Sequence, residues 1–214
     1  MLGRILNKLG RLFGRRLFKY DKGYLFELAC QTFKGNNSDP SYPDGYLSRL
    51  ATTEESSYIG GICDLPDSEI NRRFESGDIC FGVFNGSSPA NVNWIHVGSC
   101  YVRGTGYIHR AEDNEKYVYG IVTDSSERGR GLYKNALIDL AHYLFKSDTS
   151  KIVQLAQEGN EPVLHSLPKL GYKLRKQITH FRILGIKYTV IRGIEDKTVR
   201  RDLFFREPKD IFFV

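Results

Sequence analysis

Apolar residues recur every three or four positions at the start of the chain, and this pattern predicts an amphipathic helix over residues 1–20. Lysines and arginines recur at the same steps on the opposite face. The apolar positions are Leu2, Ile5, Leu6, Leu9, Leu12, Phe13, Leu17 and Tyr20, and the basic ones are Arg4, Lys8, Arg11, Arg15 and Lys19. Gly3, Gly10 and Gly14 each weaken a free helix by about 1 kcal/mol relative to alanine, so we expect it to form against a surface.

Strand and helix patterns alternate through the rest of the chain. Strands are expected at 24–32, 79–84, 92–102, 117–123, 151–155, 172–181 and 186–191, and helices at 67–75, 132–145 and 161–170. A stretch rich in Gly, Asn, Asp and Pro predicts a loop at 35–45, and residues 193–214 receive no assignment. This order predicts an α/β fold with a mixed sheet in one domain over 21–192, between the basic helix 1–20 and a C-terminal extension 193–214.

The excess of positive over negative charge is confined to residues 1–20. The chain has 31 lysines and arginines against 25 acids, and residues 1–20 hold six of the bases and no acid. The other 194 residues are therefore balanced, which argues against a nucleic-acid footprint over the whole protein. The cationic helix suits an anionic membrane surface or a protein partner. Packing of its apolar stripe on its own domain and an organellar transit peptide are the alternatives.

The cysteines and histidines show no ligand spacing. Cys30, Cys63, Cys80 and Cys100 are far apart, without a C-x-x-C pair, so we expect four free thiols in a reducing compartment and no metal. No apolar run reaches about 18 residues, so no membrane span is expected. These features predict a cytoplasmic protein, attached peripherally to a membrane if the first helix binds lipid.

The strongest chemical signal is the junction between the strand at 117–123 and the helix that begins at residue 132. The turn between them reads Arg128-Gly129-Arg130-Gly131. Glycines let a phosphate approach the backbone, and the first N–H groups of a helix have no internal partners, so the pattern is typical of a phosphate or pyrophosphate cradle. It is neither a Walker loop nor the dinucleotide pattern, whose third glycine position is Lys134 here. A solvated turn without a ligand is the alternative.

This junction resembles the acyl-CoA motif Q/R-x-x-G-x-G/A of the GNAT superfamily of CoA-dependent N-acyltransferases. Arg128 and Gly131 match the motif, and Tyr133 replaces its final small residue. A second segment resembles the family's N-x-x-A-x-x-L-Y-x-K-L-G-F element. The matching positions there are Asn160, Lys169, Leu170, Gly171 and Tyr172. The resemblance covers residues 22–192 and is strongest over 117–172.

The resemblance implies a mostly antiparallel sheet of six to seven strands flanked by helices, with acetyl-CoA as co-substrate. Main-chain groups of the fourth strand would pair with the pantetheine arm, N–H groups of the turn would bind the pyrophosphate, and Asn160 would contact the arm. The residues that it assigns to acyl-CoA are Ile121, Val122, Thr123, Arg128, Gly129, Arg130, Gly131, Leu132, Tyr133 and Asn160.

The general base that the family mechanism needs is expected at Asp124, by its position at the end of the strand. Glu112, Glu115 and Glu158 are alternatives, and each of these carboxylates is also typical of a solvated surface. His96 is interpreted as a core or sheet-face residue.

The family's tyrosine that protonates the leaving thiolate corresponds to Leu167 here. We take Tyr172 as the replacement proton donor. His165 and water are the alternatives, as is unassisted departure of the thiolate, because free thiols have a pKa of only about 8.5.

The predicted function is therefore a CoA-dependent N-acyltransferase that transfers acetyl to a primary amine by direct attack. The acceptor candidates are an amino sugar, another small amine, or a protein N-terminus or lysine. Two other interpretations remain: a long-chain acyl-CoA N-acyltransferase, and a non-catalytic GNAT-like module that binds CoA, a membrane or a partner. The sequence does not indicate the acceptor or the oligomeric state.

Overall fold

The computed structural model describes residues 2–14, 17–33, 39–102, 105–184, 186–204 and 212–213. Arg15, Arg16, part of the predicted loop at 35–45, Gly185 and most of 205–214 lie outside these ranges. The chain divides into two compact units, which are described separately below. Unit 1 comprises 1–27, 99–111 and 154–214, and unit 2 comprises 28–98 and 112–153.

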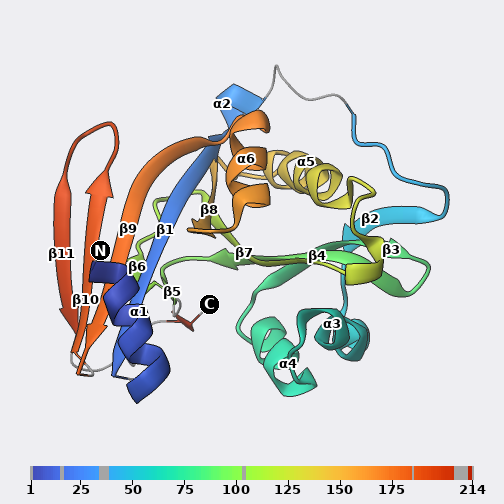
Figure 1. The fold of residues 1–214 in the computed structure, drawn as a ribbon. Coiled ribbons are helices and arrows are strands. Elements are labelled where there is room, and N and C mark those ends of the chain that lie inside the picture. The colour runs from blue at the N-terminus through green and yellow to red at the C-terminus, as the bar shows by residue number, and fades with distance from the viewer. Residues whose placement is uncertain are drawn as a thin grey trace. The chain divides into compact units, whose positions relative to one another are not determined.

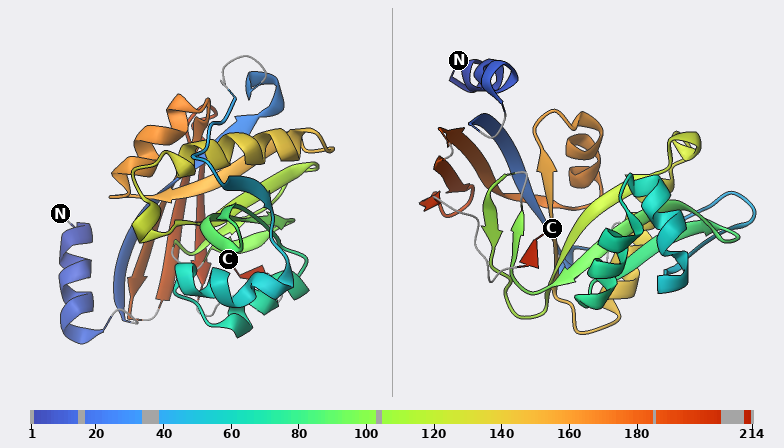
Figure 2. Two further views of the ribbon diagram at one scale, coloured as in Figure 1. Left: turned by 90° about the vertical axis from the view of Figure 1, so that its right-hand side faces the viewer. Right: turned by 90° about the horizontal axis from the view of Figure 1, so that it is seen from below.

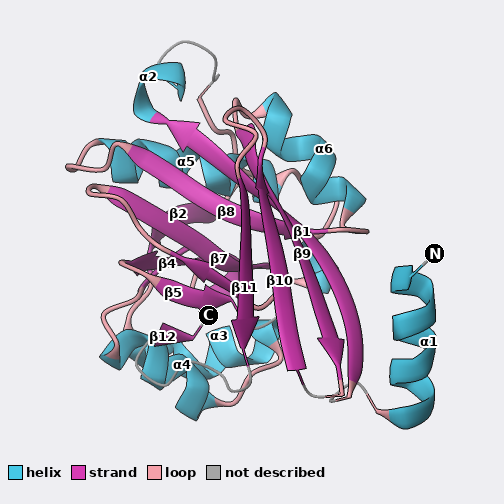
Figure 3. Ribbon diagram, turned by 90° about the vertical axis from the view of Figure 1, so that its left-hand side faces the viewer, coloured by secondary structure: helices cyan, strands magenta, loops and turns pink. Residues whose placement is uncertain are grey.

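The main sheet has nine strands, in the order β11-β10-β9-β1-β8-β7-β4-β3-β2. Figure 3 shows β11, β10, β9 and β1 side by side. The prediction of six to seven strands was too small, because it lacked β2 (Tyr46–Leu50) and β11 (Val199–Phe204). The pairings β2–β3, β3–β4, β4–β7, β1–β9, β9–β10 and β10–β11 are antiparallel. The α/β class and the mostly antiparallel character of the sheet are as expected.

Unit 2 is built on β2, β3 (Ile79–Asn85), β4 (Ser88–Val97) and β7 (Glu115–Thr123). Helices α3 (Ser56–Cys63) and α4 (Asp67–Glu75) lie below these strands in Figure 1, and α5 (Leu132–Phe145) lies above them. The short helices α2 (Cys30–Phe33), η1 (Thr53–Glu55) and η2 (Ser125–Glu127) complete the unit.

Strand alternation and helix periodicity account for the layers of unit 2. Alternate residues of a strand point to opposite faces, and on β3 the Phe81 ring stacks on Tyr143 of α5. On β4, the ring of Trp94 instead meets Phe74 of α4 with centroids 5.0 Å apart. The two faces of one sheet are therefore covered by helices from different parts of the sequence.

Unit 1 contains β1 (Phe18–Ala29, of which 18–27 belong to this unit), β9 (Lys173–Ile183), β10 (Ile186–Gly193) and β11. It also holds α1 (Leu2–Phe13), α6 (Glu161–Lys169) and a small sheet, β12-β5-β6. The small sheet is formed by Cys100–Val102, Tyr107–His109 and Phe212–Phe213. The strand β8 (Lys151–Gln157) contributes its first three residues to unit 2 and its last four to unit 1.

The N-terminal boundary differs from the prediction. The helix ends at Phe13, not Tyr20, and residues 18–20 already belong to β1. Gly14 has a φ of +95°, in the left-handed region that ends helices. The expectation that β1 continues to residue 32 was also wrong, because 30–32 lie in α2.

Other predicted elements also differ from the structure, because a glycine interrupts one strand and several short elements were not recognised. The predicted strand at 92–102 is two strands, separated at Gly98, whose φ is +108°. The sequence pattern missed β2, α3 and β6. In the extension 193–214, β11 pairs antiparallel with β10 and β12 pairs parallel with β5.

Buried His180 on β9 predicts an acid-sensitive fold. Burial, with the charges of Arg182, Lys19 and Lys187, lowers its pKa to about 3. The neutral ring therefore contributes full stability above the unfolded pKa of about 6.5, and this contribution is lost as the pH falls from there towards 3. We expect His180 to make the free energy of unfolding fall by up to about 1.4 kcal/mol per pH unit in that interval.

Denaturant unfolding at several pH values measures this dependence, and His180→Gln is the matched variant. Glutamine does not titrate and retains hydrogen-bonding groups for Thr189, whose Oγ1 lies 2.9 Å from Nδ1 of His180. The variant should lose the steep dependence on pH between 6.5 and 4. Equal slopes for both proteins would contradict the assignment to His180.

Candidate functional site

The turn between β7 and α5 contains two glycines with left-handed backbone. Gly129 has a φ of +81° and Gly131 a φ of +76°. A Cβ at Gly129 would meet no described atom within 4 Å, and one at Gly131 would meet only the Nδ2 of Asn135, at 4.0 Å. The space beside both glycines is therefore open, and glycine adopts this backbone with the least strain.

The first turn of α5 offers backbone donors at the same place. Gly131 is the N-cap, and no side chain caps the helix. The bond from Asn135 N to Gly131 O, 3.1 Å long, is the first of the helix. The N–H groups of Leu132, Tyr133 and Lys134 therefore have no helical acceptor, which is the arrangement that binds anions at helix N-termini.

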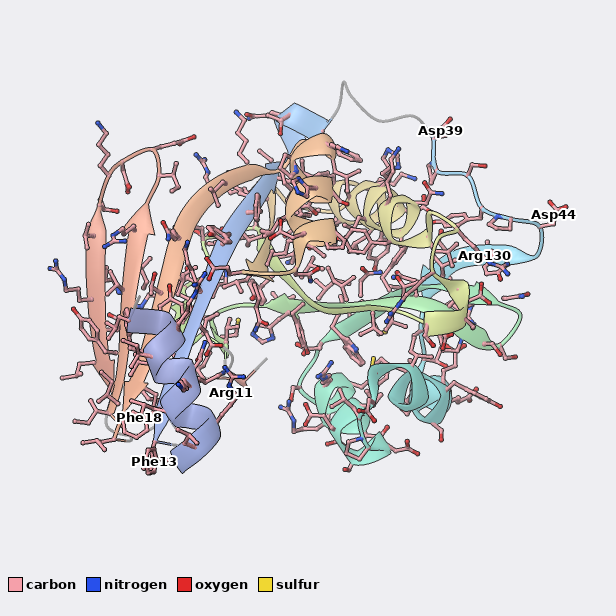
Figure 4. The ribbon with its side chains drawn as sticks, viewed as in Figure 1. Arg11, Phe13, Phe18, Asp39, Asp44 and Arg130 are labelled. Carbon is pink, nitrogen blue, oxygen red and sulfur yellow. The ribbon has the colours of Figure 1, made fainter. Side chains whose placement is uncertain are left out.

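The two arginines of the turn differ in their surroundings. Arg128 is exposed. Arg130 donates from Nη1 to the Tyr46 hydroxyl at 3.2 Å, and its Nε lies 3.4 Å from a carboxylate oxygen of Glu127 (Figure 4). The Tyr46 hydroxyl in turn donates to Glu127, a bond that raises the pKa of the tyrosine. Glu127 thus partly neutralises Arg130 and fixes its position beside the turn.

Asp124 caps the short helix η2. Its Oδ1 accepts hydrogen bonds from the hydroxyl of Ser126, at 2.5 Å, and from the backbone N of Ser126, at 2.8 Å. These bonds hold the pKa of the Asp124 carboxyl below its ordinary value. The side chain is therefore ionised at neutral pH and is a weak base, and its predicted catalytic role stays a prediction.

Tyr133 occupies the place of a small residue in the motif, and its side chain points into the protein. The hydroxyl is buried and has no hydrogen-bond partner among the described residues. Burial raises the pKa of this hydroxyl, so it is neutral at all physiological pH values. No atom of Tyr133 lies within 4 Å of a Cβ placed at Gly129 or Gly131, so the ring does not fill the space beside these glycines.

A β-bulge precedes the turn, in the part of β7 that contains Ile121, Val122 and Thr123. The register with β4 pairs Val122 with Val92 but Tyr119 with Trp94, so two residues of β7 oppose one of β4. Gly120, with a φ of +54°, lies at the bulge. Bulges bend a strand and interrupt its ladder, and they are frequent beside active sites.

The remaining predicted site residues belong to unit 1. Asn160 is exposed, and its carbonyl accepts from the backbone N atoms of Val163 and Leu164 at the start of α6. Tyr172 is buried and follows Gly171, whose φ of +89° ends that helix as expected. Leu167, at the family's tyrosine position, is completely buried. The structure thus brings together the residues from 121 to 133 within unit 2, and it places Asn160 and Tyr172 in the other unit.

The residues that were alternatives to Asp124 and Tyr172 lie outside the turn between β7 and α5. The Glu112 carboxylate lies 2.5 Å from the Lys151 ammonium, and Glu158 lies 2.9 Å from Lys22. Glu115 is buried. His165 is exposed, with its Nε2 3.6 Å from the carboxylate of Glu161. Glu112 and Glu158 thus each lie in an ion pair, and their roles as alternative bases stay predictions.

The sequence did not indicate a buried polar network in unit 2. The Asp78 carboxylate, almost inaccessible to solvent, accepts a hydrogen bond from the Tyr119 hydroxyl and lies 2.7 Å from Nδ1 of His96. Burial and the bond to Asp78 raise the pKa of Tyr119. His96 is buried on the sheet face, as interpreted from the sequence.

Arg73 of α4 connects this network to the bulge. Its guanidinium lies over the rings of Trp94 and Tyr119, 5.2 and 5.1 Å from their centroids. A Cβ at Gly120 would lie 3.1 Å from Nη1 of Arg73. The network could not be read from the sequence, because its members are far apart in the chain.

The four cysteines are free thiols, as expected. Among the described residues, no three His, Cys, Asp or Glu side chains are grouped so that they could hold a metal ion. No helix in the described ranges has both the length and the apolar character needed to cross a bilayer.

No protein-family model and no curated protein matches this chain, but solved structures do. A tandem GNAT protein from the clavulanic acid biosynthesis pathway gives a TM-score of 0.56 at 13% identity, covering 82% of this chain and 58% of that one. A GCN5-related N-acetyltransferase from Sphaerobacter thermophilus gives 0.53 at 9% identity, covering 82% and 56%. A GNAT-family acetyltransferase from Colwellia psychrerythraea gives 0.53 at 11%, covering 82% and 61%.

The fold of this chain is therefore that of the GNAT acetyltransferases, at low sequence identity. The chain spans 56 to 61% of the length of these three structures. In this chain, the junction that joins β7 to α5 through η2 is the turn described above.

Proposed function

We propose that this protein is a CoA-dependent N-acyltransferase that transfers acetyl to a primary amine. The observation that carries the proposal is the open turn between β7 and α5. It combines two left-handed glycines, three backbone N–H groups without helical acceptors, and the side chains of Arg128 and Arg130. A pyrophosphate needs this combination of backbone donors and local positive charge.

The residues of the turn fit the phosphate groups of acetyl-CoA. In this proposal the N–H groups from Gly129 to Tyr133 and the Arg128 guanidinium hold the pyrophosphate, and Ile121 to Thr123 offer main-chain groups to the pantetheine arm. Asn160 of unit 1 is assigned to the same arm. Bound acetyl-CoA supplies an acyl thioester, whose carbonyl carbon is the electrophile for an amine.

Asp124 is the proposed proton acceptor for the attacking amine, acting through water. Its lowered pKa keeps it ionised, so it is available as a base at neutral pH, although its strength is limited. The side chain of the buried Leu167 has no acidic proton, so it does not protonate the departing thiolate. Tyr172 is the proposed proton donor in its place.

A non-catalytic CoA-binding module is the second candidate, and the identity of residue 167 favours it. Since the leucine removes the family's usual proton donor, CoA could bind without efficient turnover. A further alternative is that the acyl group comes from a long-chain acyl-CoA instead of acetyl-CoA. An amino sugar or another small amine is the proposed acceptor.

Calorimetry with acetyl-CoA, CoA and a long-chain acyl-CoA tests the binding step. We expect acetyl-CoA and CoA to bind, because both carry the pyrophosphate. Release of free thiol with a panel of amines then separates the enzyme from the non-catalytic module. Absence of binding by all three ligands would overturn the proposal.

Asp124→Asn is the matched variant for the catalytic step. Asparagine keeps an oxygen that can accept from Ser126, so η2 should remain capped and acetyl-CoA should bind unchanged. Loss of the base should lower kcat by about 100-fold, in the range typical of general-base catalysis. An unchanged kcat would remove Asp124 from the mechanism and leave the binding proposal intact.

A further inference from the structure

Helix α1 buries only one edge of its amphipathic surface. Leu6 and Gly10 are buried, and a Cβ at Gly3 would lie 2.7 Å from the ring of Tyr20 on β1. The Oδ1 of Asn7 accepts a hydrogen bond from the Tyr20 backbone N at 3.0 Å. At 100° per residue, these positions form one sector of the helix, which shares only Leu6 with the apolar stripe.

Besides the buried Leu6, Leu9 is half-buried, and the other apolar residues of α1 face solvent. The exposed fractions are 55% for Leu2, 48% for Ile5, 68% for Leu12 and 63% for Phe13. Packing on its own domain therefore does not account for this stripe, since most of its apolar surface stays uncovered.

The exposed stripe continues onto the turn between β9 and β10. The ring of Phe13 contacts that of Phe18 edge-on, with centroids 6.4 Å apart, and Phe18 is the register partner of Ile183. Figure 4 shows Phe13 and Phe18 at the same end of unit 1. Ile183, Leu184 and Ile186 are exposed around this turn. We call Leu12, Phe13, Phe18, Ile183, Leu184 and Ile186 the apolar tip.

Three bases of α1 form a separate sector of the helix. Arg4, Lys8 and Arg11 are exposed, α1 contains no acid, and none of the three makes an ion pair within the described ranges. They line a groove of about 610 Å³ beside β1. The carboxylates of Asp21 and Glu158 on the far side of this groove already pair with lysines of β1. In the described ranges, neither carboxylate therefore forms a direct ion pair with a base of the helix.

We propose that the apolar tip and the three bases of α1 dock unit 1 on an anionic lipid bilayer. Leucine, isoleucine and phenylalanine side chains enter the boundary between headgroups and acyl chains, and arginine and lysine meet the lipid phosphates. A contiguous apolar patch marks an interaction surface. Charge of a single sign beside it favours a bilayer over a protein partner, whose surface mixes both signs. This docking does not depend on the acyltransferase proposal.

Co-sedimentation with vesicles of phosphatidylcholine, with and without phosphatidylserine, tests the docking with the full chain. Substitutions are preferable to truncation after residue 20, which would remove the start of β1. The triple variant Arg4→Gln, Lys8→Gln, Arg11→Gln should weaken binding to anionic vesicles roughly 100-fold, because each base near the surface contributes about 1 kcal/mol. Leu184→Asn should weaken it about tenfold through lost apolar burial.

The controls separate docking from damage to the fold. Leu184 has a φ of +49°, which asparagine adopts readily, so this variant should keep the thermal midpoint of the wild type. Leu47→Gln is the matched control, because Leu47 is 63% exposed on β2 in unit 2, outside the apolar tip. This variant should bind vesicles as the wild type does. Equal binding by wild type and both tip and charge variants, or no preference for phosphatidylserine, would overturn the proposal. Absence of vesicle binding would do the same and would leave a protein partner as the occupant.

Discussion

Gly131→Asp is expected to weaken binding of CoA and acetyl-CoA by about 100-fold or more, while the protein stays folded. The new carboxylate would lie in the open turn, where the pyrophosphate is proposed to bind, and like charges a few ångströms apart repel by several kcal/mol at a protein surface. The site has room for the side chain, because a Cβ there would meet only Asn135, at 4.0 Å. Calorimetric titration with CoA measures the change.

Gly131→Asn is the matched control for this variant. Asparagine has the size of aspartate and tolerates the φ of +76° equally well, but it carries no charge. We expect it to bind CoA within a few-fold of the wild type. Equal affinities for the aspartate and asparagine variants would show that the pyrophosphate binds elsewhere.

Asp78→Ala is expected to lower the free energy of unfolding by about 3 kcal/mol. The substitution removes the acceptor of the Tyr119 hydroxyl and the group beside His96 Nδ1, and both donors lie in the interior of unit 2. A buried donor that loses its acceptor costs about 1–3 kcal/mol, and breaking a buried charged network costs more than breaking an exposed one. Urea denaturation followed by fluorescence measures the change.

Asp44→Ala is the comparison for this measurement. Asp44 is exposed in the turn before β2, so its removal should change stability by less than about 0.5 kcal/mol (Figure 4). Tyr119→Phe, which removes one donor and keeps the carboxylate, should fall between the two. If Asp78→Ala is no more destabilising than Asp44→Ala, the network is not a structural element of unit 2.

Local signals were sufficient for the helices α4 and α5. Both have the bounds that the sequence predicts, 67–75 and 132–145. Acids occupy the first turn of α4. The apolar face of α5 recurs at helical spacing over 14 residues, of which seven are buried. The left view of Figure 2 shows α5 as a straight rod, consistent with the absence of proline within it.

Short elements that depend on pairing could not be predicted. The strand β2 has five residues and is defined by its register with β3, from Tyr46–Asn85 to Leu50–Phe81. The pattern of α3 is obscured by Gly60 and Gly61, which have low helix propensity. Gly60 is required there, since a Cβ would lie 2.8 Å from the carbonyl oxygen of Leu65.

The phosphate turn and the buried Asp78 network also differ in how far the sequence could predict them. The phosphate turn is contiguous in sequence, so glycines, arginines and the following helix could be recognised together. Asp78, by contrast, meets His96 and Tyr119 only through sheet pairing, over separations of 18 and 41 residues. The capping role of Asp124 depends on the conformation of η2, which no periodicity indicates.

The small residues of α1 have an energetic consequence for the chain's first helix. Alanine at position 3 would favour an isolated helix, yet its methyl group would collide with the ring of Tyr20. Glycine at position 3 therefore lowers the helix propensity of the free segment, but it allows the helix to pack against β1. Packing of α1 against β1 therefore contributes to the stability of a helix whose own propensity is low.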